Sequence, residues 1–208
     1  ASAMLQIASQ AMDLFSEIYG PYYHQQISLV SADFLHNMEM DGMVLLSSKV
    51  IDFYDNTAEN NLTILIPHEL SHQWFYSQVG NDQAMEPWLD EALATYSEVL
   101  FYNRYHPDLS QWWWDNRVYA HAHAGDVNNS IYDAGSYENY RASVYLNGAI
   151  FLHDLNLAMG EQAFMSALKT YAAENYLKIA TKEDFVTAMQ AANPNADIQA
   201  VFARYFNE

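Results

Sequence analysis

Two histidines four positions apart, His68 and His72, enclose Glu69 in the stretch IPHELSHQW, directly behind a proline. In an α-helix, side chains four positions apart lie on one face about 6 Å from each other, so the two imidazoles could bind a single metal ion. The alternative interpretation is that both are ordinary histidines on a helix surface. This motif constrains the fold most, because a shared ion requires the segment to be helical.

The proline restricts where that helix can begin. Pro67 has no N–H group and cannot donate to Thr63, so a helix that runs through it loses one hydrogen bond. Either the helix begins near Ile66 with Pro67 in its first turn, or it begins near Asn61 and kinks before the histidines. The apolar stretch NLTILI favours the second alternative.

A zinc ion bound by two histidines needs a third protein ligand and leaves a fourth position open for water. The chain contains no cysteine, so this ligand must be His, Asp or Glu. The candidate is Glu91 in EPWLDEALATYSE, nineteen positions after His72. This separation allows one helix to end, the chain to reverse, and a second helix to return beside the first.

These residues carry a resemblance to a known family. The pattern His68-Glu69-x-x-His72, followed after eighteen residues by Glu91 in WLDEA, resembles the gluzincin zinc aminopeptidases, the family of aminopeptidase N and leukotriene hydrolase. The flanking HQWF and ATYSE add to it. The resemblance implies that His68, His72 and Glu91 bind one zinc ion. It also implies that Glu69 takes a proton from zinc-bound water and later delivers it to the leaving amine.

Two further segments resemble the same family. Glu39, in the stretch MEMDGM, matches the glutamate of a Gly-Ala-Met-Glu-Asn segment that binds the free amino terminus of the substrate, although His36, Asn37 and Met40 depart from that pattern. Tyr145, in YLNGA, matches the tyrosine of a Tyr-x-x-Gly-Ala stretch, which donates a hydrogen bond to the oxyanion. The resemblance therefore implies an aminopeptidase.

Residues that orient the ligands are candidates on the second helix. Ligand histidines usually donate their other ring nitrogen to a carboxylate or carbonyl, and Glu98 lies two turns beyond Glu91 on the same face. Thr95, one turn beyond Glu91, could orient the Glu91 carboxylate. The alternative for both is plain helix surface and packing.

Apolar periodicity predicts a mainly α fold with a small β-containing N-terminal lobe, an α+β arrangement. The resemblance implies a thermolysin-like zinc metallopeptidase catalytic domain. Strands are predicted over 26–30 and 43–46, and helices over the first twenty residues and over 61–79, 86–105, 110–122, 138–159, 161–175, 182–192 and 195–206. We expect one catalytic domain of two lobes, 1–106 with the strands and zinc helices and 107–208 with helices alone.

The resemblance corresponds to the family's catalytic domain without its amino-terminal β-domain. The chain also lacks an initiator methionine, so we expect a fragment of a larger protein from which that β-domain is missing.

The charge of the chain excludes one class of partner. With 26 acidic and 8 basic residues its net charge is −18, which repels phosphate backbones, so nucleic acid is not expected as a partner. No apolar run approaches the roughly 20 residues needed to span a bilayer, so no membrane insertion is expected in this segment. Nothing in the sequence indicates a compartment.

The sequence therefore predicts a zinc-dependent hydrolase that removes N-terminal residues from peptides with a free amino terminus. Two alternatives stay open. One is a thermolysin-like endopeptidase, in which the altered Glu39 segment permits internal cleavage. The other is a non-catalytic binding module that keeps zinc only for stability. The sequence does not indicate the preferred substrate side chain.

Overall fold

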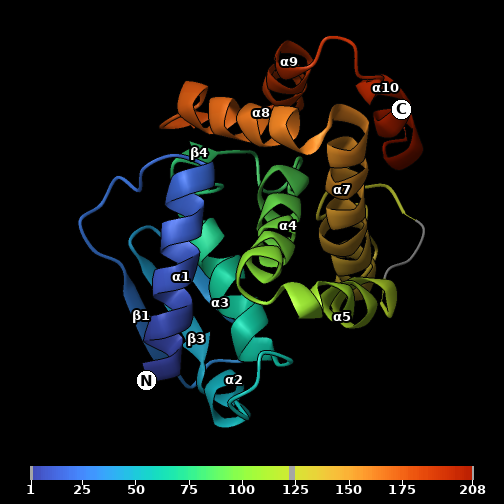
Figure 1. Ribbon diagram of the computed structural model, residues 1–208. Coiled ribbons are helices and arrows are strands. Elements are labelled where there is room, and N and C mark those ends of the chain that lie inside the picture. Colours follow the sequence, from blue (N-terminus) through green and yellow to red (C-terminus); the bar gives the residue numbers. More distant parts are fainter. Residues whose placement is uncertain (1, 122–124, 208) are drawn as a thin grey trace.

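The computed structural model describes residues 2–121 and 125–207, which form a mainly helical fold with a three-stranded and a two-stranded sheet (Figure 1). The strands are β1 (Ser28–Ala32), β2 (Met38–Met40), β3 (Met43–Ser47), β4 (Val79–Gly80) and β5 (Lys178–Ile179). The helices are α1 (Ser2–Ile18), α2 (Ser48–Asp52), α3 (Asn61–Ser71), α4 (Trp88–Tyr105), the short 3₁₀ helix η1 (Pro107–Leu109), α5 (Ser110–Trp113), α6 (Tyr137–Tyr140), α7 (Gly148–Met159), α8 (Glu161–Glu174), α9 (Lys182–Ala192) and α10 (Ile198–Tyr205). Two π-helical stretches, η2 (Trp114–Tyr119) and η3 (Arg141–Asn147), continue α5 and α6. The predicted α+β fold class is confirmed.

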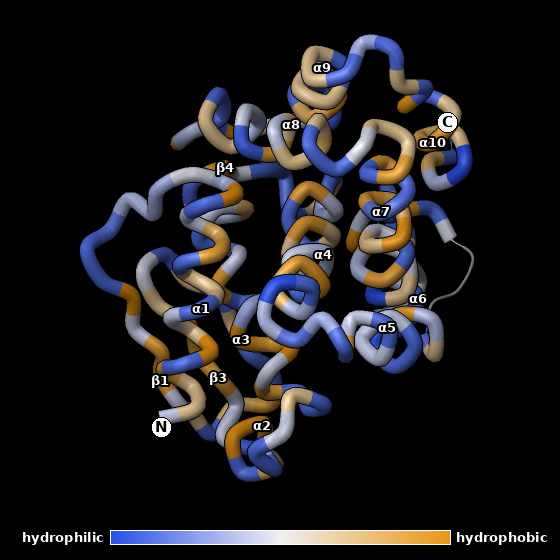
Figure 2. The backbone as a smooth tube through the Cα atoms, in the orientation of Figure 1, coloured by the Kyte–Doolittle hydropathy of each residue, from blue (hydrophilic) through white to orange (hydrophobic). Residues whose placement is uncertain are grey.

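The three-stranded sheet has the strand order β1-β3-β2, and β4 pairs in parallel with β5 in the two-stranded sheet. β1 runs parallel to β3, and β2 runs antiparallel to it with Glu39 opposite Val44. As an edge strand, β2 packs beside α3 and so brings Glu39 toward that helix. The strands predicted over 26–30 and 43–46 correspond to β1 and β3, whereas β2 was not predicted as a strand. Figure 2 shows hydrophobic residues in β1 and β3 and a hydrophilic connection from α1 to β1.

Helix α3 begins at Asn61 because the side chain of Asn60 caps it. The Asn60 side-chain oxygen accepts hydrogen bonds from the backbone N–H groups of Leu62 and Thr63 at 2.8 and 3.2 Å. The helix then continues through Pro67, so the earlier of the two possible starts is the one observed. Nine of its eleven residues are buried, which places the helix inside the protein and not on its surface.

The end of α3 differs from the prediction. The helix stops at Ser71 instead of continuing to residue 79. The chain then turns back, with the Tyr76 N–H donating to the Val79 carbonyl at 2.9 Å and Tyr76 itself at a positive φ of 130°. Likewise, the helix predicted over 110–122 is divided into α5 and η2 and ends at Tyr119. Its last predicted position, 122, lies outside the described residues.

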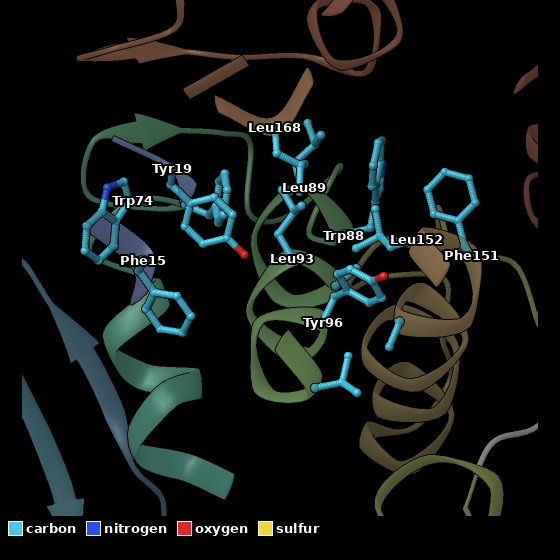
Figure 3. Packing of buried hydrophobic residues seen from close by; sticks show 14 of the residues in the cluster. Phe15, Tyr19, Trp74, Trp88, Leu89, Leu93, Tyr96, Phe151, Leu152 and Leu168 are labelled. Carbon is cyan, nitrogen blue, oxygen red and sulfur yellow. The ribbon is translucent and has the colours of Figure 1, made fainter. Parts of the chain in front are cut away.

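Helix α4 lies between α3 and α7 and packs against both (Figure 1). Trp88 at its first position is fully buried, with edge-on ring contacts to Phe151, Phe185 and Phe206 at centroid distances of 5.8, 5.2 and 5.2 Å. Figure 3 shows this ring near Phe151, with Leu89, Leu93 and Tyr96 farther along α4. This aromatic cluster fixes the amino-terminal end of α4, which is the end that carries Glu91. No helix in the described residues is long and apolar enough to cross a membrane.

Helices α4 and α7 come closest at Gly148. A Cβ atom built on Gly148 would lie 2.5 Å from the Cβ atom of Ala92 and 3.3 Å from its Cα atom, which is too close for either helix to keep its position. Gly148 directly follows η3, which carries Tyr145, and Ala92 directly follows Glu91. The glycine therefore sets how closely the two segments of the candidate site approach each other.

We expect Gly148→Ala to lower the free energy of unfolding by about 1–3 kcal/mol, because the added methyl group overpacks this contact. In an unconstrained helix interior the same change would raise the free energy of unfolding by roughly 1 kcal/mol. A decrease would therefore indicate the close contact with Ala92. Chemical denaturation measures it. The matched control is Ala92→Gly in the Gly148→Ala background, which removes the opposing methyl group and should recover part of the loss. If the Gly148→Ala single variant is as stable as the wild type, the close approach of α4 and α7 at Gly148 is contradicted.

Candidate active site

Helix α3 and the first turn of α4 bring three predicted ligands together. His68 and His72 are buried, with ring centroids 5.0 Å apart. Their Nε2 atoms lie 3.3 and 3.6 Å from the same Glu91 oxygen, Oε2. That oxygen is buried and makes no hydrogen bond to any of the residues that the structure describes. One nitrogen from each histidine and one carboxylate oxygen therefore face a common point, all within 4.8 Å of one another.

The other ring nitrogens of the two histidines are already occupied. His68 Nδ1 donates to Glu98 Oε1 at 2.9 Å, and His72 Nδ1 donates to Asp90 Oδ1 at 2.6 Å. These bonds hold each ring with Nε2 toward Glu91, which is the usual arrangement around ligand histidines. Two imidazoles, one carboxylate and an open side fit a zinc ion. Glu98 thus lies where the sequence predicted, whereas Asp90 was not anticipated.

Glu98 is the centre of a buried charged cluster. Its carboxylate accepts hydrogen bonds from Arg117 Nη2 at 2.7 Å, Arg117 Nε at 2.8 Å and Trp113 Nε1 at 2.9 Å. Burial raises the pKa of Glu98, but the Arg117 guanidinium outweighs it and holds the pKa below its usual value. Glu98 therefore stays ionised beside His68. Sequence reasoning missed Arg117 and Trp113, although an arginine among only 8 basic residues was an available signal.

Thr95 does not take the role expected of it. Its hydroxyl donates to the backbone carbonyl of Glu91 at 2.7 Å and not to the carboxylate. A threonine inside a helix commonly bonds the carbonyl four positions earlier, and Thr95 does so here. The prediction that Thr95 orients the Glu91 carboxylate is corrected accordingly.

The proton affinities at the site follow from burial and from the neighbouring charges. Burial lowers the pKa of His68, but the carboxylates of Glu91 and Glu98 outweigh it and raise the pKa to about 9. His72 behaves in the same way beside Asp90, with its pKa well above the usual value. For Glu69, burial raises the pKa to about 7 although His68 and His72 oppose it. A carboxyl group with this pKa can both accept and return a proton near neutral pH.

The remaining predicted residues surround the same point. The Tyr145 ring stacks on the His68 ring at 6.0 Å with 9° between the planes. Burial raises the Tyr145 pKa well above its usual value, so the phenol stays a hydrogen-bond donor. A Glu39 carboxylate oxygen lies within 4.8 Å of ligand atoms of Glu69 and His72. All of these side chains line one cavity of about 240 Å³.

Comparison with known proteins gives consistent matches over nearly the whole chain. A model of the peptidase family M1 domain matches residues 3–205. Aminopeptidase N of Haemophilus influenzae is 28% identical over 193 residues, which are 86% of this chain and 22% of that protein. Human aminopeptidase Q is 27% identical over 195 residues, which are 86% of this chain and 20% of that protein. The chain thus spans about a fifth of the length of these two curated relatives.

Solved structures show the same fold. The M1 zinc metallopeptidase from Deinococcus radiodurans superposes with a TM-score of 0.76 at 21% identity, covering 97% of this chain and 43% of that one. Aminopeptidase A of Legionella pneumophila superposes with a TM-score of 0.81 at 16% identity, covering 99% of this chain and 24% of that one.

Proposed function

Because the chain belongs to peptidase family M1, we propose that it is the catalytic part of a zinc aminopeptidase that removes N-terminal residues from peptides. The observation that carries this proposal is the set of side chains that line one small cavity. Three side chains that fit zinc, a buried carboxyl group, a phenol and a second carboxylate all line it. A structural zinc site needs neither the buried carboxyl group nor the phenol nor the second carboxylate, and it normally has a fourth protein ligand.

In this proposal His68, His72 and Glu91 hold the metal. A bound zinc ion would act as a Lewis acid, lowering the pKa of water and polarising the substrate carbonyl group. Glu69 accepts the proton of the attacking water and later gives it to the leaving amine. Tyr145 donates its O–H to the oxygen of the carbonyl carbon under attack. Such a donor typically contributes about 100- to 1000-fold in rate.

Glu39 supplies the preference for a free amino terminus. A carboxylate is suited to a primary ammonium group because the hydrogen bond between them is charge-assisted. Its closeness to Glu69 and His72 would place the ammonium group one residue before the bond that is cut. The edge strand β2 fixes Glu39 in this position by its pairing with β3.

We also propose that the chain is one catalytic domain of two lobes, divided between residues 106 and 107. The first lobe supplies β2, α3 and α4, and the second supplies η3 with Tyr145. Since one cavity is lined from both lobes, neither would hold the complete site alone.

The function is tested with alanine anilide and N-acetylalanine anilide on the zinc-loaded protein. We expect cleavage of the free amine only. Glu39→Gln should raise KM for alanine anilide about 10- to 100-fold, the effect of losing a hydrogen bond to a charged group. The exposed Glu174→Gln is the matched control and should behave as the wild type. Cleavage of internal bonds in blocked peptides would instead favour an endopeptidase, and bound zinc without any cleavage a binding module.

A further inference from the structure

Arg141 lines the catalytic cavity, and its guanidinium has no direct acceptor among the described residues. The chain has only 8 basic residues, and two of them, Arg117 and Arg141, line this cavity. Arg117 is committed to Glu98 through two hydrogen bonds. Arg141 is half-buried and makes no hydrogen bond or ion pair with any residue in 2–121 or 125–207. A guanidinium that carries five N–H donors and lacks an acceptor suits an acidic ligand group.

Groups of opposite charge line the cavity beside different histidines. Glu39 lies beside Glu69 and His72. Arg117 is linked to His68 through Glu98. Arg141 interacts electrostatically with Arg117 and Glu98, and burial together with the Arg117 charge lowers the pKa of Arg141. Glu39 is therefore close to His72, whereas the two arginines are close to Glu98, the hydrogen-bond partner of His68.

This polarity gives the substrate a direction, provided that the proposed function holds. With the substrate ammonium group at Glu39 and its carbonyl group at the histidines, the arginines beside Glu98 are available to the residue that follows the carbonyl group. Arg141 opens the η3 stretch that also carries Tyr145, whose ring stacks on His68. Arg141 and the proposed oxyanion donor are therefore held by the same helical stretch.

We propose that Arg141 binds a carboxylate of the residue that follows the cleaved bond, so that the site selects peptides acidic at that position. The carboxylate is either the C-terminal group of a dipeptide or an acidic side chain. Arginine forms paired, charge-assisted hydrogen bonds with a carboxylate, and burial strengthens them.

The size of the cavity agrees with a substrate that ends near Arg141. Its volume of about 240 Å³ is below the roughly 300–1,000 Å³ usual for drug-sized ligands. Arg117 and Arg141 also line a second cavity of about 170 Å³, together with Glu59 and Trp112. The two arginines thus lie at the border between both cavities.

The test compares substrates that differ only in this carboxylate. Ala-Ala is compared with its C-terminal amide, and Ala-Asp amide is compared with Ala-Asn amide. All four substrates begin with alanine, because its methyl group fits a side-chain pocket of any shape. In the wild type, KM for at least one acidic substrate should be about 10- to 100-fold below that of its neutral partner. Arg141→Met should abolish this difference, and Arg141→Lys should keep part of it.

The control variant is Arg104→Met, which removes an exposed arginine that pairs with Glu17 and should keep the full preference. Which of the two substrate pairs responds identifies the source of the carboxylate. Equal KM values within both pairs in the wild type, or an unchanged preference in a folded Arg141→Met protein, would overturn the proposal.

A second measurement does not depend on turnover. Calorimetric titration of Ala-Ala and its amide into the zinc-loaded Glu69→Gln protein, with and without Arg141→Met, measures the same preference as a ratio of Kd values. If alanine anilide is not cleaved by the wild type, the proposed function fails, and this titration still decides whether Arg141 binds a carboxylate. Equal Kd values for acid and amide would then reject the site as well.

Discussion

Replacing Glu69 by glutamine is expected to lower kcat about 100- to 10,000-fold, the usual contribution of a general acid–base group, while zinc stays bound. Glutamine has nearly the same size as glutamate and still hydrogen-bonds, but it cannot accept a proton at neutral pH. Glu69 adjoins His68 in sequence, yet the buried oxygen shared by both histidines belongs to Glu91. The change should therefore affect proton transfer and leave the ligand set intact.

The measurement is kcat on alanine anilide together with zinc content by elemental analysis. Glu174→Gln, an exposed acid on α8, is the matched control and should change neither quantity. Activity within a factor of three of the wild type would remove Glu69 from the mechanism. Loss of zinc along with activity would instead place Glu69 among the groups that hold the metal.

Replacing Glu91 by alanine should have the larger effect on the metal. Without this carboxylate only two histidine ligands remain, and zinc sites in proteins normally have three or four protein ligands. We expect zinc content to fall from about one per chain to near zero and cleavage to become undetectable. Because a ligand that binds only the folded state raises stability, zinc should raise the Tm of the wild type and leave that of the variant unchanged.

Circular dichroism separates this result from simple unfolding, since the variant should keep its helical signal. Glu161→Ala, at the exposed start of α8, serves as the control and should bind zinc as the wild type does. A folded Glu91→Ala protein with a full complement of zinc would contradict the proposed ligand set.

The sequence was sufficient to predict that His68, His72 and Glu91 lie close together, because their geometry is local. His68 and His72 are one helical turn apart, and Glu91 follows after a single reversal of the chain. Glu98 could be predicted for the same reason, since it shares a helix face with Glu91. The proximity of all four depends on two adjacent helices and needs no knowledge of the rest of the fold.

The contacts that the sequence did not predict depend on tertiary packing. Asp90 points toward His72 only because of the way α4 packs on α3, and its position next to Glu91 gave no such indication. Arg117 reaches Glu98 from η2, which is a distant segment. The strands β4 and β5 are two residues long, too short for an alternating pattern, and they pair across about a hundred positions. The early end of α3 depends on Tyr76, whose positive φ no sequence pattern indicated.

The high proton affinity of the two buried histidines determines how the site conserves charge. The neighbouring carboxylates raise the pKa of His68 to about 9 and that of His72 well above its usual value, which favours the imidazolium form of both rings when no cation lies between them. Binding one Zn²⁺ releases one proton from each imidazolium ring. The two positive charges of the ion then replace those of the two protons, so the net charge of the buried cluster does not change. The carboxylates of Asp90, Glu91 and Glu98 therefore have counter-charges both before and after metallation. In the metal-free site the imidazolium groups thus take the place of the ion as counter-charges.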